Sequence, residues 1–435
     1  MKDRILQFSR KSYIDSFFAI LSFLIGAFSV FFNILKINSV GSFLFKTSFV
    51  IILLWFALHL FFKYFSKSDE INSFSFKQVF VSIYKTKQFN NLLVIVLISL
   101  LSLISILISS KFKIGSFSFF NQYICFISCL VLFYLILFSN INGKALSAIL
   151  LINLILSYTV VILFLTGVAR TWHNTTSWTD LNLNFQNPNP AGEFCFIVLM
   201  LLVGTVFYFK NLVVKVLSAC CAPAIFFLMN LTSSRNPFIA LLLAGIVLLA
   251  IVLIKNNRKT VLALSVIIPI VYVFSIMFVG IIGDNSNSLK DLLEKYEIYG
   301  RYYPWAEHLK EYSRNVLFGS YYLVGETGAI ASFVNSYLMV LIVFGPISFF
   351  LFVIFQYKLL SVVSSKIETE FIHPTNIYPI LCFLAILYLG LNEGGVFVGA
   401  GGLHILGIYC GAIFNRFVIK EKQPMLLAQH YSIDI

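Results

Sequence analysis

The chain has 435 residues, of which 59% are hydrophobic and 11% are charged, and its formal net charge is +13. This composition supplies too little polar surface to cover a soluble globule, so it excludes an ordinary soluble domain. A basic excess suggests nucleic acid in a soluble protein, but here most Lys and Arg flank apolar runs, as in oriented membrane proteins. We therefore expect a lipid bilayer as partner and no nucleic acid.

Long apolar stretches fill most of the sequence, and several exceed the roughly 18 residues that span a bilayer. The opening run from Ser16 to Leu35 is as long as a full span and lacks a small-residue cleavage pattern, so we expect it to be retained. The sequence predicts an all-α polytopic integral membrane protein, with about twelve transmembrane helices in a single helical domain over residues 1–435. The predicted spans are 14–35, 42–62, 92–110, 117–139, 145–167, 193–209, 212–231, 237–254, 260–282, 331–356, 377–391 and 396–414.

The gaps between these spans alternate in charge. Every second gap, starting with the N-terminal Lys2, Arg4, Arg10 and Lys11, is rich in lysine and arginine and is expected to be cytoplasmic, as are both termini. The opposite gaps include two long ones, 168–192 and 283–330, which we expect to be periplasmic loops. The larger loop lies between the ninth and tenth spans, and Ser288 with Asp291 and Pro304 predict two short helices in it, broken at Gly300.

Several kinds of chemistry have no pattern in the sequence. All seven cysteines fall within apolar runs, which is typical of small packing residues and not of a disulfide frame or metal site. We find no nucleotide-binding loop, metal-ligand cluster or serine nucleophile elbow. We therefore expect no metal and no cofactor, and any reaction must draw its driving force from an activated substrate.

Arg235 is the strongest candidate for a functional residue. It lies in a polar turn, Thr232 to Asn236, squeezed between two apolar runs, where an arginine costs free energy unless it meets an anion, a carbonyl or water. The guanidinium group suits a phosphate. The alternative is that Arg235 only reaches the outer headgroups and ends the span.

Three further arginines on the expected outer side lie close to aromatic residues. Arg170 precedes Trp172 and Trp178, Arg301 is followed by Tyr303 and Trp305, and Arg314 follows Tyr312. Aromatic rings can stack on sugars while an arginine holds a nearby phosphate. The alternative for many of these rings is the interfacial aromatic belt of a membrane protein.

Candidate acid–base groups are weaker. Glu326 lies between glycines in Gly325-Glu-Thr-Gly328, where a ligand could approach closely, and His308 has a suitable ordinary pKa for proton transfer. Either could act as a general base, although most loop carboxylates are expected to form a solvated face. Glu193 and Glu393 at span edges and His59 and His404 deeper in spans are intramembrane ionisable groups, and such groups are functional candidates.

The order of these outer motifs resembles the O-antigen polymerase and ligase superfamily of bacterial envelope glycosyltransferases. Phe185-Gln-Asn-Pro-Asn-Pro-Ala-Gly192 resembles the family's Phe-x-Asn-Pro-Asn segment, and Thr232-Ser-Ser-Arg-Asn236 resembles its Thr-x-Ser-Arg turn. Gly300-Arg-Tyr-Tyr-Pro-Trp305 resembles the opening of its large external loop, and Asn335-Ser-Tyr-Leu338 with Gly345 resembles the exit from that loop. Ligases typically have a His before the exit Asn, where this chain has Val334, so the polymerase is favoured.

The resemblance implies an O-antigen polymerase in the bacterial inner membrane, which joins undecaprenyl-diphosphate-linked oligosaccharide repeats at the periplasmic face during lipopolysaccharide O-antigen biosynthesis. It also allows a chain-length regulator as a partner. Under this reading Arg235 and Arg170 hold the departing diphosphate, Arg301 and Arg314 position the sugar chains, and Glu326 or His308 deprotonates the attacking hydroxyl. The candidate catalytic residues are Arg235, Arg170, Arg301, Glu326 and His308, and the candidate substrate-binding residues are Arg314, Trp172, Trp178, Tyr303, Trp305, Asn189 and Asn335.

Three alternatives stay open. An O-antigen ligase and an exopolysaccharide or capsule polymerase would share these features. A flippase for the same lipid-linked oligosaccharide belongs to another class, and it should place its polar residues near the bilayer midplane on broken helices. The concentration of polar residues in the predicted outer loops favours an enzyme.

Overall fold

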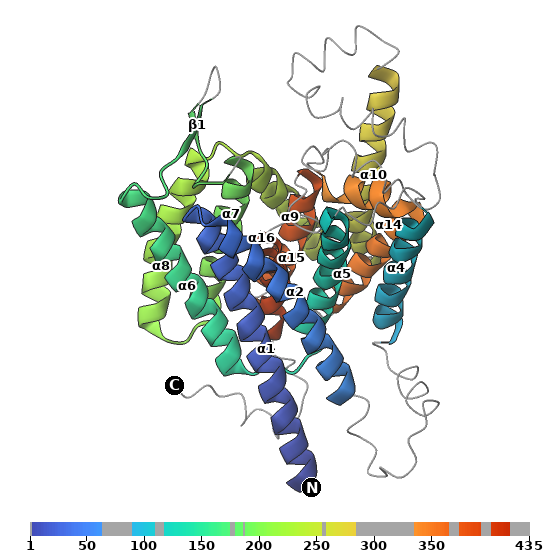
Figure 1. Cartoon of the computed structure of the whole chain (residues 1–435), viewed down its shortest axis with the longest axis horizontal. Helices are drawn as coiled ribbons and strands as arrows, with labels where there is room; N and C mark the ends of the chain where they lie inside the picture. The colour runs from blue at the N-terminus through green and yellow to red at the C-terminus, as the bar shows by residue number, and fades with distance from the viewer. Residues whose placement is uncertain are drawn as a thin grey trace.

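The structure, a computed structural model, describes residues 2–62, 89–108, 117–174, 179–185, 188–254, 258–283, 335–364, 374–392 and 402–417. These residues form a helical bundle with one short β-hairpin (Figure 1). The helices are α1 (Lys2–Ile34), α2 (Asn38–Leu60), α4 (Phe89–Ile108), α5 (Phe117–Phe138), α6 (Gly143–Leu165), α7 (Pro188–Tyr208), α8 (Leu212–Leu231), α9 (Asn236–Leu253), α10 (Arg258–Gly283), α14 (Ser336–Ser364), α15 (Pro374–Asn392) and α16 (Leu403–Ala412), the last continued by the 3-10 turn η4 (Ile413–Arg416).

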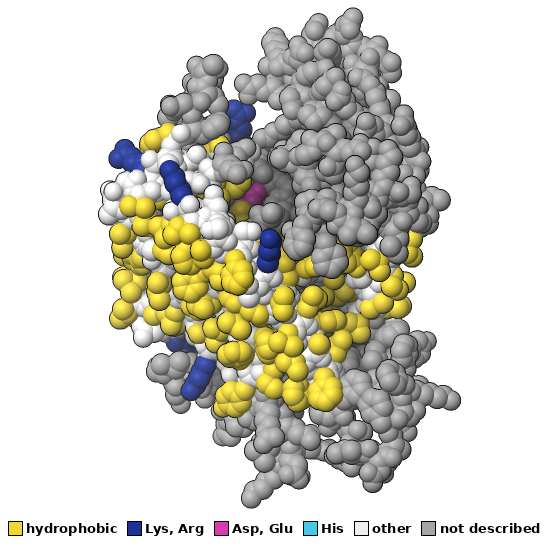
Figure 2. Space-filling model, viewed as in Figure 1, with side chains coloured by type: hydrophobic (Ala, Val, Ile, Leu, Met, Phe, Trp, Pro, Cys, Tyr) yellow, Lys and Arg dark blue, Asp and Glu magenta, His cyan; other side chains and the backbone are white. Residues whose placement is uncertain are grey.

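Each predicted span overlaps one of these helices, so the prediction of a predominantly α-helical chain is confirmed. Within the described residues, seven helices are long and apolar enough to cross a bilayer, which is compatible with a multi-pass membrane protein. The exposed side chains agree, because a broad band of apolar residues crosses the face of the bundle shown in Figure 2, with basic side chains above and below it.

Several boundaries differ from prediction, most of all the start of α1, which begins at Lys2, twelve residues before the predicted start. Helix α7 begins at Pro188, five residues before the predicted start, because proline suits a first helical turn and needs no hydrogen-bond partner for its nitrogen. Helix α14 continues to Ser364, eight residues past the predicted end. The prediction stopped early because Gln356 and Lys358 interrupt the apolar run, although the helix continues through them. Hydropathy marks the apolar part of a helix and not its polar turns.

We call the two ends of the bundle the amino-terminal end and the arginine end. The amino-terminal end contains Asp15 of α1 and Asn140, which follows α5, and these two residues are hydrogen-bonded. The arginine end contains Arg170, after α6, and Arg235, before α9. Figure 1 shows the chain's N-terminus and strand β1 at opposite ends of the molecule.

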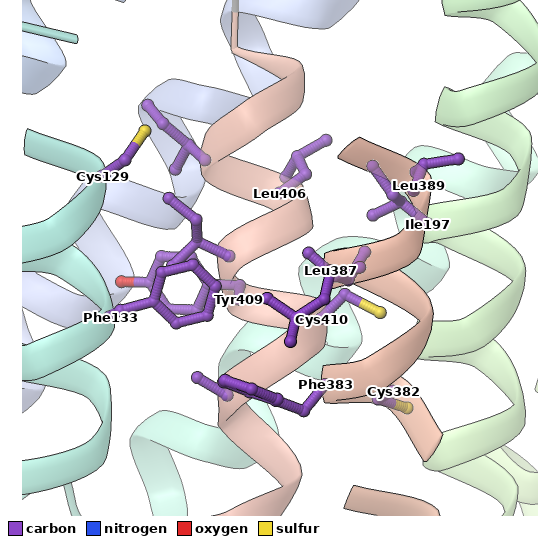
Figure 3. Close-up of a cluster of buried hydrophobic side chains, with 14 of the residues drawn as sticks. Cys129, Phe133, Ile197, Cys382, Phe383, Leu387, Leu389, Leu406, Tyr409 and Cys410 are labelled. Carbon is purple, nitrogen blue, oxygen red and sulfur yellow. The ribbon is translucent and has the colours of Figure 1, made fainter. Parts of the chain in front are cut away.

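Helix α16 lies inside the bundle, and its buried residues contact α1, α2, α5, α7 and α15. A Cβ on Gly407 would lie 3.4 Å from Ile197 of α7, and one on Gly204 of α7 would overlap the ring of Phe414. Both residue numbers rise by seven between these contacts, so α7 and α16 run parallel. Figure 3 shows Tyr409 and Cys410 of α16 near Phe133 of α5 and Phe383 of α15.

Helix α1 packs along α16 and runs antiparallel to it. The Tyr409 hydroxyl lies 2.6 Å from Ser22 Oγ, and Gly402 lies against Gly26 and Ser29. Ser29 precedes the last helical residue of α1 by five positions, so the described part of α16 begins about 7 Å below that end of α1. Of the predicted 396–414 span, the structure describes residues 402–414, and the helix begins at Leu403.

Two side chains predicted to lie deep in spans are buried. His404, in the first turn of α16, packs between Phe45 and Phe49 of α2, with ring centroids 4.9 and 6.1 Å away. His59 lies near the last turn of α2, at the amino-terminal end. Six of the seven cysteines are buried, as expected of packing residues, and Cys220 is exposed.

Candidate functional site

The turn that carries Arg235 joins α8 to α9 at the arginine end. Thr232 caps the last turn of α8, and its hydroxyl donates to the Met229 carbonyl at 2.7 Å. Ser233 has a φ of 52°, a left-handed conformation that lets the chain reverse within three residues. Arg235 then becomes the N-cap residue of α9, with its carbonyl accepting from Ile239 N at 3.1 Å.

Within this turn, buried and exposed residues alternate. Thr232, Ser234 and Asn236 are buried, whereas Arg235 is exposed. No hydrogen-bond or ion-pair partner is recorded for the Arg235 side chain in the part of the chain that the structure describes. Ser234 Oγ also lacks a partner there, and a buried hydroxyl of this kind can be satisfied by a bound ligand or water.

The first turns of α7 pack directly on the Arg235 turn. A Cβ on Gly192 would lie 2.5 Å from Ser234 Cβ and 2.9 Å from Thr232 Oγ1. Only glycine allows this approach, because any other residue would overlap the serine. The contact brings together the 185–192 segment and the 232–236 turn, which are 40 residues apart in the sequence and which carry two of the four resembling motifs.

Arg170 and Trp172 lie at the same end of the bundle, just before and at the start of a β-hairpin. Strands β1 (Trp172–Asn174) and β2 (Thr179–Leu181) pair antiparallel, with Trp172 opposite Leu181, and β2 contacts both α7 and α8. The Arg170 guanidinium lies over the rings of Phe164 and Trp172, with its Cζ 5.7 and 5.9 Å from their centroids. This cation–π contact holds an exposed arginine at the same end as Arg235.

The residues after the hairpin anchor it to the bundle. Asn184 Nδ2 donates to the Ile34 carbonyl at 2.5 Å and to the Val168 carbonyl at 2.9 Å. The Asn184 amide donates to Thr171 Oγ1 at 2.8 Å, and Thr171 is also hydrogen-bonded to Asn182. The predicted 168–192 loop is therefore held against the end of α1, and its last residues belong to α7.

Glu193 is a carboxylate whose burial the sequence did not reveal. It follows Gly192 in α7, and only 1% of its surface is exposed. Because α7 runs parallel to α16 and Ile197 lies beside Gly407, Glu193 is level with Leu403, the first residue of α16. A carboxylate is favourable there, because the N-terminus of a helix carries a partial positive charge.

The remaining described candidates have local roles. Asn189 lies half-buried in the first turn of α7, one turn before Gly192. Asn335 is fully buried, and its Oδ1 accepts from Leu338 N at 2.8 Å, so it caps α14. Helix α14 packs mainly on α4, α10 and α15, and not on the helices next to Arg235. Seven predicted site residues lie outside the described residues: Arg301, Tyr303, Trp305, His308, Arg314, Glu326 and Trp178.

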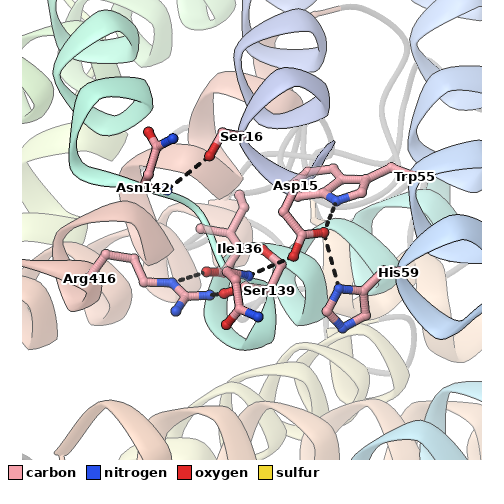
Figure 4. Close-up of polar contacts among 9 residues, drawn as sticks. Asp15, Ser16, Trp55, His59, Ile136, Ser139, Asn142 and Arg416 are labelled. Atoms are coloured by element: carbon pink, nitrogen blue, oxygen red, sulfur yellow. Dashed lines mark hydrogen bonds and ion pairs between the residues drawn. The ribbon is translucent and has the colours of Figure 1, made fainter. Parts of the chain in front are cut away.

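A second polar cluster, which sequence reasoning missed, lies at the amino-terminal end (Figure 4). Asp15 Oδ1 accepts from Trp55 Nε1 at 2.9 Å and lies 3.2 Å from His59 Nδ1, while Oδ2 accepts from Asn140 N at 2.7 Å. Asp15 and His59 are each 1% exposed. The available signal was a charged residue within a predicted span, which marks an intramembrane ionisable group.

The basic end of η4 completes this cluster. Arg416 Nε donates to the Ile136 carbonyl at 2.7 Å, and its terminal nitrogen donates to the Ser139 carbonyl. Asn142 N donates to Ser16 Oγ at 2.9 Å. These bonds satisfy carbonyl groups at the end of α5 and tie the turn between α5 and α6 to α1 and η4, which is a structural role.

The arginine end therefore presents two exposed guanidinium groups, Arg170 with the Trp172 ring beside it and Arg235 next to the closely packed Gly192–Ser234 contact. Such groups suit an anionic ligand with a flat apolar surface, for example a phosphate attached to a sugar. Comparison with known proteins adds no assignment, since no family model, no curated protein and no solved structure matches the chain.

Proposed function

We propose that this chain is an O-antigen polymerase, a glycosyltransferase that joins undecaprenyl-diphosphate-linked oligosaccharide repeats at the periplasmic face of the bacterial inner membrane. The substrate class comes from the sequence resemblance. The arginine end would be the reaction site and would face the periplasm.

One observation carries the proposal most directly. Gly192 packs against Ser234, so two of the three resembling segments with described residues are in contact, and Arg235 is exposed beside that contact. The third segment, at the start of α14, packs mainly on other helices. Antiparallel packing of the consecutive helices α7 and α8 places these two segments, which are 40 residues apart in the sequence, at the same end of the bundle. Their meeting next to an arginine supports a common site.

The chemistry follows from the charges at this end. In the proposed transfer, a sugar hydroxyl of the acceptor attacks the anomeric carbon of the donor, the bond from that carbon to the diphosphate oxygen breaks, and a base takes the hydroxyl proton. Negative charge grows on the departing diphosphate. Arg235 and Arg170 supply positive charge where that growth occurs, which lowers the barrier. The base would be Glu326 or His308, both of which lie outside the described residues.

The deciding experiment is the lipopolysaccharide band pattern of a strain that lacks the gene. A polymerase deletion should leave a single repeat on the core, and the ladder should return when the intact chain is expressed. A full ladder in the deletion strain would contradict the proposal. Lipid-linked polymer that accumulates without attachment would instead indicate a ligase, and an altered surface polysaccharide other than O-antigen would indicate an exopolysaccharide or capsule polymerase.

A flippase for the same lipid is the second candidate, and a specific observation favours it. Asp15 and His59 form a buried ionisable pair, the kind of group that proton-coupled transporters use. In addition, Gly345 (φ 86°) before Pro346 breaks α14 inside the bundle. A flippase deletion should remove the surface sugar altogether, including the single repeat, so the same gel separates the two functions.

A further inference from the structure

A groove of about 530 Å³ lies between α9 and α10. Its walls are almost entirely apolar and include Ile246, Val247 and Ala250 of α9 and Leu264 and Ile268 of α10. Helix α9 packs mainly on α15, and α10 packs mainly on α14, so these two consecutive helices touch each other sparsely. The groove is the space left between them, and it opens on the exposed apolar belt of the bundle.

An exposed apolar stripe connects Arg235 to this groove. The stripe consists of residues of α9 at helical spacing after Arg235, all of them exposed: Ile239, Leu242, Ile246, Leu249 and Leu253. Successive members are three or four positions apart, so they share one face of the helix with Arg235. Ile246 belongs to both the stripe and the groove. A cation thus stands at the head of an apolar path that ends in an apolar groove.

The depth of the groove limits what can fill it from the arginine end. On α9, the lining residues Ile246 to Ile254 follow Arg235 by 11 to 19 residues, about 16 to 28 Å along the helix axis. On α10, the lining runs from Val261 to Ser275, so this wall reaches back toward the arginine end. The hydrocarbon core of a bilayer is about 30 Å thick, so a chain anchored at one face fills about 15 Å. An ordinary phospholipid held at Arg235 would therefore leave the far end of the groove, at Ile254 and Val261, unfilled.

We propose that the stripe and groove bind the hydrocarbon chain of a phosphate-headed lipid longer than one leaflet, of the polyprenyl type, with its phosphate at Arg235. This inference rests on the proposed function for the identity of the donor lipid and adds where its chain lies. The guanidinium complements the phosphate, and the groove buries apolar surface that only a long chain can reach. A chain held in this way would bring each donor to Arg235 in one orientation.

Photocrosslinking tests the proposal directly. A photoreactive phenylalanine derivative replaces Ile246 in the full chain, and a control carries it at Ile155 of α6. The two side chains are similarly exposed, 56% and 66%, but Ile155 does not line the groove. Each variant is reconstituted in phosphatidylethanolamine–phosphatidylglycerol vesicles that contain tritiated undecaprenyl diphosphate or, separately, tritiated phosphatidylglycerol.

The expected result is strong labelling at Ile246 by the polyprenyl probe, well above that at Ile155, with no such difference for phosphatidylglycerol. Combination with Arg235→Ala should reduce the Ile246 labelling about tenfold or more, because a charge-assisted contact is lost. Equal polyprenyl labelling at both positions, preferential labelling of Ile246 by phosphatidylglycerol, or labelling that Arg235→Ala leaves unchanged would each overturn the proposal.

A groove-filling variant gives a second test. Ala250→Phe places a ring in the groove and should reduce polyprenyl labelling from Ile246, whereas Ala263→Phe adds the same ring to a half-buried position of α10 that does not line it. Equal labelling in these two variants would count against the groove. The proposed function fails separately: if Arg235→Ala abolishes the O-antigen ladder while Ile246 labelling is unselective, the function stands and the groove inference is wrong.

Discussion

Arg235 is exposed between two buried neighbours, Ser234 and Asn236, so the fold holds the turn firmly while it leaves the guanidinium outside. A membrane-associated chain with a basic excess has many arginines and lysines that only meet headgroups. Arg235 differs because its turn packs against Gly192, which fixes where the positive charge stands. A fixed charge can stabilise a transition state, since it needs no reorganisation during the reaction.

Replacement of Arg235 should therefore abolish long polysaccharide chains. We expect Arg235→Ala to lower the polymerisation rate by about 10²- to 10³-fold, the usual effect of removing one group that stabilises developing negative charge. Arg235→Lys should restore activity poorly if two parallel hydrogen bonds to phosphate are needed. The measurement is the chain-length ladder of a complemented deletion strain, with membrane levels of each variant determined by immunoblot. A normal ladder with Arg235→Ala would contradict the assignment.

We expect that no larger residue can replace Gly192, because a side chain there would clash with Ser234. The backbone conformation of Gly192 does not itself require glycine. Gly192→Ala puts a methyl group 2.5 Å from Ser234 Cβ, so the Arg235 turn must move and activity should fall. Ser234→Gly removes the clashing carbon, and the double variant should recover part of the lost activity. Ladder length is again the readout. If the double variant is no better than Gly192→Ala alone, the clash is not the cause.

At the scale of elements, Asp15 connects segments that are far apart in the sequence. Its carboxylate binds Trp55 and His59 of α2 from its place on α1, and also the Asn140 amide after α5. Hydrophobic association does not align helices within a bilayer, because lipid tails are as apolar as the side chains. A buried polar cluster therefore fixes the relative positions of helices that apolar packing alone would leave free to slide.

Loss of this carboxylate should destabilise the bundle. We expect Asp15→Ala to lower the free energy of unfolding by about 3 to 5 kcal/mol, since it leaves buried donors unpaired. Ser16→Ala removes one hydrogen bond, to Asn142 N, and should cost only about 1 kcal/mol. Thermal unfolding of the purified variants in detergent would measure both. Equal and small effects would show that the cluster does not hold the helices together.

At the scale of the whole molecule, the described basic residues fall at both ends of an apolar belt (Figure 2). Lys144 at the start of α6 and Lys210 and Lys215 around the start of α8 lie at the amino-terminal end, and Lys36 and Arg170 lie at the arginine end. The positive-inside rule assigns the lysine-rich end to the cytoplasm. Which end faces which compartment stays a prediction.

Cysteine labelling can test this orientation. In a variant with its exposed native cysteine removed by Cys220→Ser, a cysteine is introduced at Lys36 or at Lys144. A membrane-impermeant maleimide applied to cells with a permeable outer membrane should label the Lys36 position, because the arginine end is expected to face the periplasm, and should label Lys144 only after the cells are lysed. The reverse pattern would overturn the orientation and, with it, the periplasmic reaction site.

The sequence by itself determined the helices and the candidate arginines. Apolar runs predicted every described helix, since a span must satisfy its own backbone hydrogen bonds and bury little polarity. It also singled out Arg235, because a charge squeezed between apolar runs is costly, and Arg170, because aromatic residues that could stack on sugars follow it. The polar ends of α7 and α14 escaped prediction, because hydropathy does not register polar helical turns.

Only the tertiary structure decided which of these residues meet. The Gly192–Ser234 contact, the position of Glu193 beside the start of α16 and the Asp15–His59 pair all join residues from different helices. Helix periodicity gives the face on which a residue lies, but the neighbour of that face depends on how the helices pack. In an apolar chain nearly every face is compatible with lipid or with another helix, so hydrophobicity does not choose between them, and the close contacts of small and polar residues do.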